Sequence, residues 1–224
     1  KTELITTMSP EEIYELIKKY LPVRNEEKDK YGEVFTPSLL INEMFDNLPK
    51  QLWSNPDLKW LDPANGVGNF PMIAYVRLME GLKKKIPDDK KRSEHIIENM
   101  LYMVELNEKN VAVSRKIFGS NANIFCGSFL SEDNKSVNLK VLEAFGIDNF
   151  DVIMGNPPFQ KEQTGKREGS YGGKALWPTF VYESFGILEK NGYLSFINPP
   201  GWRGCGEHSS LWDFISHKQL MYLH

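Results

Sequence analysis

The chain has 224 residues with a hydrophobic content of 41%, a charged content of 25% and a net charge of −3. These values are typical of one globular domain with a sizeable core, and they argue against a broadly basic nucleic-acid coat but not against a local basic groove. No apolar run is long enough to span a bilayer, and the polar N-terminus does not resemble a signal peptide. We therefore expect a cytoplasmic protein without a membrane partner.

The first predicted element is a helix over residues 9–21, with Ser9 as N-cap, Pro10 at the first helical position and Glu12 as capping-box acid. A charged linker and a helix over residues 39–48 follow. Beyond them, strands rich in β-branched and aromatic residues alternate with helices. The predicted strands cover residues 58–62, 99–105, 123–127, 150–154 and 193–197. The predicted helices cover residues 69–85, 107–118, 175–190 and 209–217.

This alternation predicts βαβ units and therefore an α/β fold with a doubly wound, mainly parallel sheet. Crossovers between parallel strands are right-handed, so the carboxyl ends of the strands should lie along one edge. Ligands of open α/β sheets bind at that edge. Residues that directly follow predicted strands are therefore the candidates for a functional site.

Two polar segments interrupt the alternation. Residues 83–95 (KKKIPDDKKRSEH) are predicted as a solvated surface loop because most of their side chains are charged. Residues 160–174 are polar and rich in glycine, so we expect this segment to be mobile when no ligand is bound.

The two cysteines, Cys126 and Cys205, form no CxxC pair, so we expect reduced thiols that are packed inside the protein. The four histidines show no ligand spacing with each other or with the cysteines. We therefore expect no metal site.

A glycine-containing turn follows the strand predicted over residues 58–62, in LKWLDPANGVGNF. Gly66 and Gly68 allow a tight turn and a close approach of the backbone to a ligand. Taken alone, this turn has the plainer interpretation of an ordinary strand-to-helix connection. The next predicted strand, however, ends at Glu105, and an acid at that place can bind a ribose diol or serve as a capping acid. Turn and acid together, without the third glycine of the dinucleotide fingerprint, suit a nucleoside cofactor without pyrophosphate, such as S-adenosylmethionine.

The stretch FDVIMGNPPF places Asn156 just past the strand predicted over residues 150–154. Pro157 and Pro158 stiffen the backbone and carry no N–H donors, which leaves carbonyl oxygens available, and Phe159 is predicted as an exposed aromatic residue. An amide oxygen, a rigid carbonyl and a flat apolar face suit an amino group on a planar ring. Two acceptors would localise the nitrogen lone pair and stabilise the positive charge that develops on nitrogen during methyl transfer.

A second Asn-Pro-Pro, residues 198–200, ends the strand predicted over residues 193–197. Gly201 follows it instead of an aromatic residue. We therefore predict a wall or turn at Asn198 and assign the chemistry to Asn156.

In this order the motifs resemble those of the amino-group DNA methyltransferases, specifically the N6-adenine enzymes whose cofactor motifs precede the catalytic motif. YGEVFTP resembles the motif that holds the methionine end of the cofactor, and DPANGVGNF resembles DPxxGxGxF. MVELN carries the ribose acid, and IFCGSFL resembles a third motif in which the family often has an acid where this chain has Ser128. The resemblance implies these cofactor-binding residues: Phe35, Thr36, Pro37, Asp62, Gly66, Gly68, Phe70, Glu105, Asn107, Ser128 and Phe129.

GNPPF matches the catalytic motif of the family, so the resemblance implies Asn156, Pro157, Pro158 and Phe159 as catalytic residues. It also implies the Rossmann-like fold of S-adenosylmethionine-dependent methyltransferases, S-adenosylmethionine as cofactor, and the N6 amino group of adenine in double-stranded DNA as the target. The target base would have to leave the helix stack to reach Asn156. We expect the basic residues of the 160–174 segment to contact DNA phosphates: Lys161, Lys166, Arg167 and Lys174.

The resemblance extends over nearly the whole chain. It divides the chain into an N-terminal helical segment, residues 1–50, which carries FTP, and a catalytic domain, residues 51–224, truncated before the last strands and the target-recognition domain of the family. The nearest resemblance is to the methyltransferase regions of larger restriction–modification enzymes. We therefore expect further domains or subunits as partners, for target recognition or cleavage, although no nuclease motif is visible in this chain.

Two other functions stay open on the sequence. The same Asn-Pro-Pro-aromatic set occurs in enzymes that methylate a glutamine side chain or a base in RNA, although FTP ahead of the glycine turn favours adenine in DNA. A non-catalytic, methyltransferase-like specificity subunit is the other alternative, and the intact NPPF argues against it.

Overall fold

The computed structural model describes residues 36–131, 139–159, 175–202 and 209–222. The helix predicted over residues 9–21, Phe35, the basic residues of the 160–174 segment and Cys205 lie outside these ranges. Among the described helices, none combines the length and apolar character needed to cross a bilayer.

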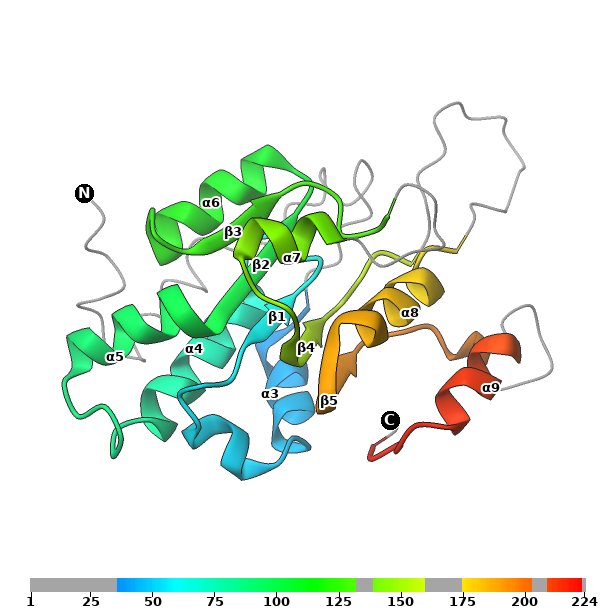
Figure 1. Cartoon of the computed structure of the whole chain (residues 1–224), viewed down its shortest axis with the longest axis horizontal. Helices are drawn as coiled ribbons and strands as arrows, with labels where there is room; N and C mark the ends of the chain where they lie inside the picture. Colours follow the sequence, from blue (N-terminus) through cyan, green and yellow to red (C-terminus); the bar gives the residue numbers. More distant parts are fainter. Residues whose placement is uncertain (1–35, 132–138, 160–174, 203–208, 223–224) are drawn as a thin grey trace.

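Five parallel strands form one sheet in the order β3-β2-β1-β4-β5 (Figure 1). From the central strand β1 the chain runs outward to β2 and β3, returns to the other side of β1 as β4, and continues outward to β5. The order therefore reverses between β1 and β4, which confirms the predicted doubly wound parallel α/β sheet. The strands span Trp60–Asp62 (β1), Leu101–Glu105 (β2), Asn123–Cys126 (β3), Phe150–Gly155 (β4) and Leu188–Phe196 (β5).

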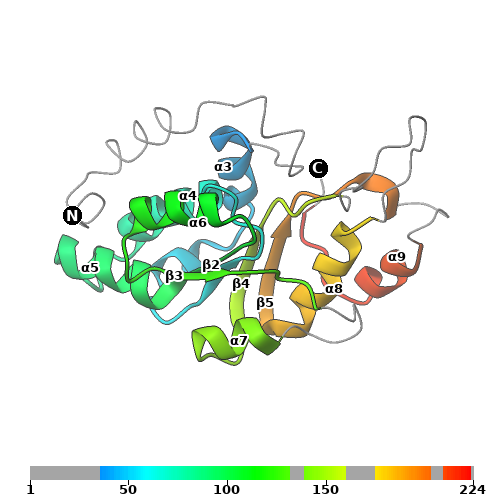
Figure 2. The same ribbon diagram turned by 90° about the horizontal axis from the view of Figure 1, so that it is seen from above.

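Helices cover both faces of this sheet (Figure 2). Trp60, Met103 and Val152 belong to a core shared with α3, α4 and α6 on one face. Leu61 and Ile153, one residue further along their strands, belong to the core on the other face, together with α7 and α8. The helices span Ser38–Asp46 (α3), Asn69–Gly81 (α4), Asp89–His95 (α5), Glu108–Phe118 (α6), Leu139–Phe145 (α7), Trp177–Ile187 (α8) and Ser209–Ser216 (α9), with short helical turns at Lys50–Ser54, Ile96–Met100 and Pro200–Trp202.

Helix α3 is held tightly against α4. Ile41 and Phe45 of α3 are fully buried in the core. The Arg77 guanidinium of α4 donates to the side-chain oxygen of Asn42 at 2.7 Å and to its carbonyl oxygen at 3.0 Å, and pairs with Asp46 at 2.8 Å. Residues just before α3 therefore have a fixed place beside α4. The domain division at residue 50 stays a prediction.

The prediction of a solvated loop over residues 83–95 is wrong for its second half. Asp88 accepts the Lys91 N–H at 2.8 Å and caps α5. Arg92 is 2% exposed and donates to the Ile86 carbonyl oxygen at 2.7 Å. The high charge of the segment hides one buried arginine, whose two terminal nitrogens donate to protein oxygens while its buried Nε has no partner among the described residues. Helix α5 continues through the turn Ile96–Met100 directly into β2, which begins at Leu101 and not at residue 99.

The boundary predicted between the helix over residues 175–190 and the strand over residues 193–197 is also wrong. Helix α8 ends at Ile187, and β5 begins at the next residue, with Leu188 opposite Phe150. The register then shifts, so that Tyr193 lies opposite Val152. Asn191 has a positive φ of 67°, and a Cβ at Gly192 would lie 2.8 Å from the Asp151 carbonyl oxygen. Asn191-Gly192 therefore serves an irregularity inside the strand and not the end of the helix.

Candidate active site at the switch point of the sheet

The predicted site residues gather at the carboxyl ends of three adjacent strands. Asp62 ends β1, Glu105 ends β2, and Asn156 directly follows β4. The strand order reverses between β1 and β4, so Asp62 and Asn156 flank this point, and Glu105 lies one strand away on β2. This is the place at which open α/β sheets form a ligand crevice.

The turn after β1 adopts the conformation that its glycines predict. Gly66 has φ +56° and Gly68, which precedes α4, has φ +97°. A Cβ at Gly68 would lie 3.1 Å from the Phe118 ring, whereas at Gly66 it would meet no described atom within 4 Å. Asn65 anchors the turn, since its backbone N–H donates to the Val104 carbonyl at 2.9 Å and its side-chain amide donates to Ser114 Oγ at 2.8 Å. The backbone at Gly66 is therefore held in place, and the space beside its Cα is open.

Glu105 joins the glycine turn to the loop after β2. Its carboxylate accepts the backbone N–H of Gly66 at 2.6 Å and that of Asn107 at 2.7 Å. The Asn107 side chain in turn accepts the Lys109 N–H at 3.0 Å and caps α6. The structure therefore brings together the two features, turn and acid, that the sequence linked by their order alone.

Asp62, the last residue of β1, is only 1% exposed. Burial raises the pKa of the Asp62 carboxyl from 3.8 to about 8, the Ala64 N–H that it accepts at 3.0 Å lowers it in part, and the nearby charge of Glu105 raises it further. A Cβ at Gly155 would lie 2.9 Å from Asp62 Oδ1. Asp62 therefore packs directly against the end of β4, next to Asn156.

Asn156 makes a contact with the FTP motif. Its side-chain Nδ2 donates to Thr36 Oγ1 at 3.1 Å, and Thr36 is 4% exposed. The Thr36 carbonyl oxygen accepts from Asn69 Nδ2, at the start of α4, at 3.5 Å. Thr36 thus lies between the residue that follows β4 and the helix that follows the glycine turn. Pro37 comes next and precedes α3.

The rest of NPPF is more enclosed than predicted. Pro157 is buried, and Pro158 is half-buried. The prediction that Phe159 is exposed is wrong, because its ring is half-buried against the cluster formed by Trp177, Val181 and Leu211. The Phe159 carbonyl oxygen also accepts the Leu176 N–H at 3.0 Å. Only one part of the ring surface is left for contact with a ligand.

Two further aromatic residues of the predicted cofactor site lie in the core. Phe70 is 3% exposed, with its ring 6.0 Å from that of Phe45. Phe129 is also 3% exposed and stacks on Phe180 with ring centroids 5.5 Å apart. Direct contact of either ring with a cofactor stays a prediction.

Cys126 ends β3, and Ser128 lies in the loop that follows it. Ser128 is exposed, and its hydroxyl exchanges hydrogen bonds with the backbone N–H and carbonyl of Leu130 at 3.1 and 3.0 Å. Cys126 is exposed as well, so the prediction of a packed thiol is wrong at this residue. It ends β3 at the sheet edge, where pairing and burial are incomplete.

Leu106 is a candidate that the sequence interpretation missed. It lies between Glu105 and Asn107, and 72% of its surface is exposed. The signal in MVELN that could have indicated this residue is a large apolar side chain between two polar residues, just after the end of the strand. It offers an apolar face beside the Glu105 carboxylate.

The second Asn-Pro-Pro lies beside the first. The Ile197 N–H donates to the Gly155 carbonyl oxygen at 3.1 Å, so the ends of β4 and β5 are in direct contact. Asn198 Oδ1 is buried and has no hydrogen-bond partner among the described residues. Pro200 begins a helical turn. The predicted role of Asn198 as a wall or turn stays a prediction.

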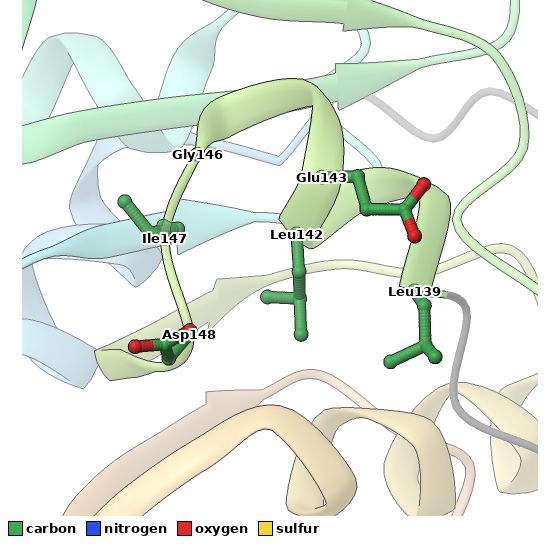
Figure 3. A pocket seen from close by; sticks show the side chains of 6 residues that line it. All are labelled: Leu139, Leu142, Glu143, Gly146, Ile147 and Asp148. Atoms are coloured by element: carbon green, nitrogen blue, oxygen red, sulfur yellow. The ribbon is translucent and has the colours of Figure 1, made fainter.

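A hollow of about 320 Å³ lies elsewhere, at α7 and the loop that leads into β4 (Figure 3). That loop enters the amino end of β4, so the hollow lies at the sheet edge opposite Asn156. The side chains of Leu139 and Leu142 project from the same side of α7 in Figure 3. The lining residues are Leu139, Leu142, Glu143, Gly146, Ile147 and Asp148.

Two curated relatives match most of this chain. One, from Mycoplasma pneumoniae, bears the name uncharacterized adenine-specific methylase and is 28% identical over 79% of this chain and 57% of its own length. The other, the type II methyltransferase M.VspI from Vibrio sp. strain 343, is 27% identical over 76% of this chain and 37% of its own length. The chain therefore spans less than two thirds of the length of either relative.

Solved structures share the fold. A modification subunit assigned to a type I restriction enzyme of Vibrio vulnificus superposes with a TM-score of 0.61 at 19% identity, over 93% of this chain and 44% of that one. A Listeria monocytogenes protein assigned as a class I S-adenosylmethionine-dependent methyltransferase gives a TM-score of 0.58 at 16% identity, over 94% of this chain and 60% of that one. These similarities confirm the predicted methyltransferase-type fold.

The sequence itself matches a described family over residues 38–223, which includes β1 to β5 and each of the site residues from Asp62 to Phe159. The chain belongs to the Eco57I restriction-modification methylase family.

Proposed function

We propose that this chain transfers a methyl group from S-adenosylmethionine to the N6 amino group of adenine in DNA. The observation that carries the proposal is the position of Asn156, which follows β4 at the switch point, one strand from the glycine turn after β1 and two strands from Glu105 at the end of β2. The family, and relatives named as adenine-specific methylase and type II methyltransferase, support the same reaction.

The residues present fit a nucleoside cofactor. Gly66 has open space where a side chain would stand, so a ligand can approach its backbone closely. Glu105 offers carboxylate oxygens for a ribose diol, and Leu106 offers an apolar face for a planar base. By resemblance, Thr36 and Pro37 hold the methionine end. When bound, S-adenosylmethionine supplies an activated methyl group on a sulfonium.

The acceptor amine would be held by oxygen atoms of the NPPF motif. Asn156 Oδ1 and the Pro157 carbonyl oxygen can each accept one hydrogen of the amine. This pair of hydrogen bonds draws the nitrogen lone pair out of conjugation with the ring and stabilises the positive charge that forms on nitrogen. The part of the Phe159 ring that is not buried offers a stacking surface for the base. The proton can leave after transfer, so Asn156 has to orient the amine and is not required to act as a base.

Adenine in a duplex cannot reach Asn156 while it is stacked, so we propose that the target base is flipped out of the helix. Double-stranded DNA is then the macromolecular partner, with Lys161, Lys166, Arg167 and Lys174 as proposed phosphate contacts. Because this chain spans only part of its relatives, we also propose that further domains or subunits read the recognition sequence.

Radiolabelled S-adenosylmethionine tests the proposal when it is incubated with the protein and separate DNA, RNA and protein acceptors. Digestion of the labelled acceptor identifies the product. We expect N6-methyladenine from DNA with the wild type and none with Asn156→Ala. Label in RNA or in a glutamine side chain would keep the chemistry and change the substrate. No label on any acceptor, from this chain and from longer natural forms, would reject the proposed function.

A further inference from the structure

We infer that Thr36 is a positioning residue: its hydroxyl accepts from the nitrogen end of the Asn156 side-chain amide and so leaves the oxygen end to face the acceptor amine. This inference rests on the proposed function and gives Thr36 a role besides contact with the cofactor.

The two ends of the Asn156 amide are chemically opposite. Oδ1 only accepts hydrogen bonds, and Nδ2 only donates them. The last torsion of an asparagine side chain is broad and nearly two-fold, so an unrestrained amide samples both orientations. With Nδ2 toward the acceptor, donor would face donor and the amine would not be held. An enzyme that uses Asn156 Oδ1 therefore needs a partner for Nδ2 on the other side.

Thr36 supplies that partner. Asn156 Nδ2 donates to Thr36 Oγ1 at 3.1 Å. The amide is planar, with oxygen and nitrogen on opposite sides of Cγ, so holding the nitrogen at Thr36 turns the oxygen away from Thr36. Thr36 is 4% exposed, whereas Asn156 is half-buried. The nitrogen end is thus held on the buried side of the residue.

Thr36 itself is fixed, so its Oγ1 has a defined place beside Asn156. A hydroxyl can also donate, and the exchange of the Asn156 amide protons therefore distinguishes the contact from Nδ2 to Oγ1 from the reverse orientation. The Pro37 carbonyl oxygen accepts the Ile41 N–H at 3.2 Å and so joins Thr36 and Pro37 to the start of α3. Fully buried Ile41 and the contacts of Arg77 hold α3 on α4. The acceptor for Asn156 therefore comes from a rigid element that lies 120 residues earlier in the chain.

The test compares Thr36→Val, which keeps the shape and removes the acceptor, with Thr36→Ser, which keeps the hydroxyl. The first readout is the ¹⁵N–¹H signal of the Asn156 side-chain amide, identified by its loss in Asn156→Ala. We expect one amide proton to exchange with solvent about five- to tenfold more slowly in the wild type and Thr36→Ser than in Thr36→Val.

The second readout separates binding from chemistry. In single-turnover methylation at saturating S-adenosylmethionine and duplex DNA, Thr36→Val should lower the rate about ten- to hundredfold, a larger factor than any change in the Kd for S-adenosylmethionine, whose methionine end Thr36 also holds by resemblance. Thr36→Ser should stay within about threefold of the wild type in rate. An Asn156 amide signal that is the same in Thr36→Val and wild type would overturn the inference. So would a rate loss matched by an equal loss of cofactor affinity.

These outcomes remain separate from the fate of the proposed function. If the wild type methylates no acceptor, the proposed function fails. The exchange of the Asn156 amide then decides the orienting contact by itself, since it requires neither substrate nor turnover. Protection lost in Thr36→Val and kept in Thr36→Ser supports the contact, and unchanged protection rejects it.

Discussion

The Glu105 carboxylate accepts the Gly66 backbone N–H at 2.6 Å, so the tip of β2 and the turn after β1 form one hydrogen-bonded unit. The same carboxylate accepts the Asn107 N–H at 2.7 Å. A single side chain thus holds two loops at the edge where we propose that the cofactor binds. Its removal should affect both stability and binding.

Glu105→Ala leaves two backbone N–H groups without their acceptor. Because such groups are costly when poorly solvated, we expect the free energy of unfolding to fall by about 2–4 kcal/mol and cofactor affinity to fall at least about tenfold. Urea denaturation and calorimetric titration with S-adenosylmethionine measure the two effects. Glu108→Ala, at an exposed acid in the first turn of α6, is the matched control and should change neither by much. Unchanged affinity in a folded Glu105→Ala would remove Glu105 from the site.

Leu106→Ser should weaken cofactor binding without loss of stability. The side chain is 72% exposed, so the folded protein gains little from its burial. A planar base that covers it would bury apolar area worth about 1–2 kcal/mol, which corresponds to about a five- to thirtyfold change in Kd. Leu139→Ser makes the same change at a residue that is 59% exposed at the opposite sheet edge and should leave the Kd unchanged. Equal effects of the two substitutions would contradict the proposed contact.

The Asp62 carboxyl should make stability depend on pH in an unusual direction. Its folded pKa of about 8 lies above the ordinary 3.8, so between these values the folded state holds a proton that the unfolded state has lost. The contribution of Asp62 therefore decreases as pH rises from about 4 to about 8, by at most about 1.4 kcal/mol per pH unit. Asp62→Asn removes this contribution.

Urea denaturation at several pH values between 5 and 9 measures the difference in unfolding free energy between wild type and Asp62→Asn. Other ionisable groups cancel in this difference. We expect it to shift in favour of Asp62→Asn as pH rises to about 8 and to level off above that. A difference that stays constant with pH would mean that Asp62 is ionised in the folded protein throughout.

Arg92→Ala should destabilise the protein although it lies in a segment dense with lysines. The guanidinium is 2% exposed and donates to the Ile86 and Pro87 carbonyl oxygens at 2.7 and 3.2 Å. Its loss leaves these acceptors unpaired and opens a cavity, which should cost about 2–4 kcal/mol. Lys91→Ala, at the exposed neighbouring residue, should change the unfolding free energy by less than about 0.5 kcal/mol. Similar effects of the two would show that the contacts of Arg92 are not needed for stability.

The sequence predicts well the features whose cause is local. The tight turn at Gly66 and Gly68, the helix predicted to begin near Asn107 and the strand that ends before Asn156 all depend on residues within a few positions. Alternating strands and helices were sufficient for the sheet type. The edge of the sheet at which the site lies follows from that topology, since a parallel sheet places the carboxyl ends of its strands together.

Features that depend on distant residues could not be predicted in this way. Burial of Arg92 requires carbonyl groups that face inward, and nothing in KKKIPDDKKRSEH distinguishes that arginine from its solvated neighbours. The half-burial of Phe159 requires α8 and α9 to supply Trp177 and Leu211. The short helix α7 was missed because a single buried residue, Val141, gives it no readable periodicity. The contact between Thr36 and Asn156 spans 120 residues and has no local signal.

The order of the strands along the chain also means that the two parts of the proposed site can form at different times during synthesis. Strands β1, β2 and β3 follow one another in the chain and pair with each other, so the glycine turn and Glu105 can meet as soon as this part has been synthesised. The pairing of Trp60 in β1 with Val152 in β4 can form only after β4 has been synthesised, and Asn156 directly follows that strand. A nascent chain that has folded only as far as β3 therefore possesses the half of the crevice proposed to hold the methyl donor, without the half that would present an acceptor.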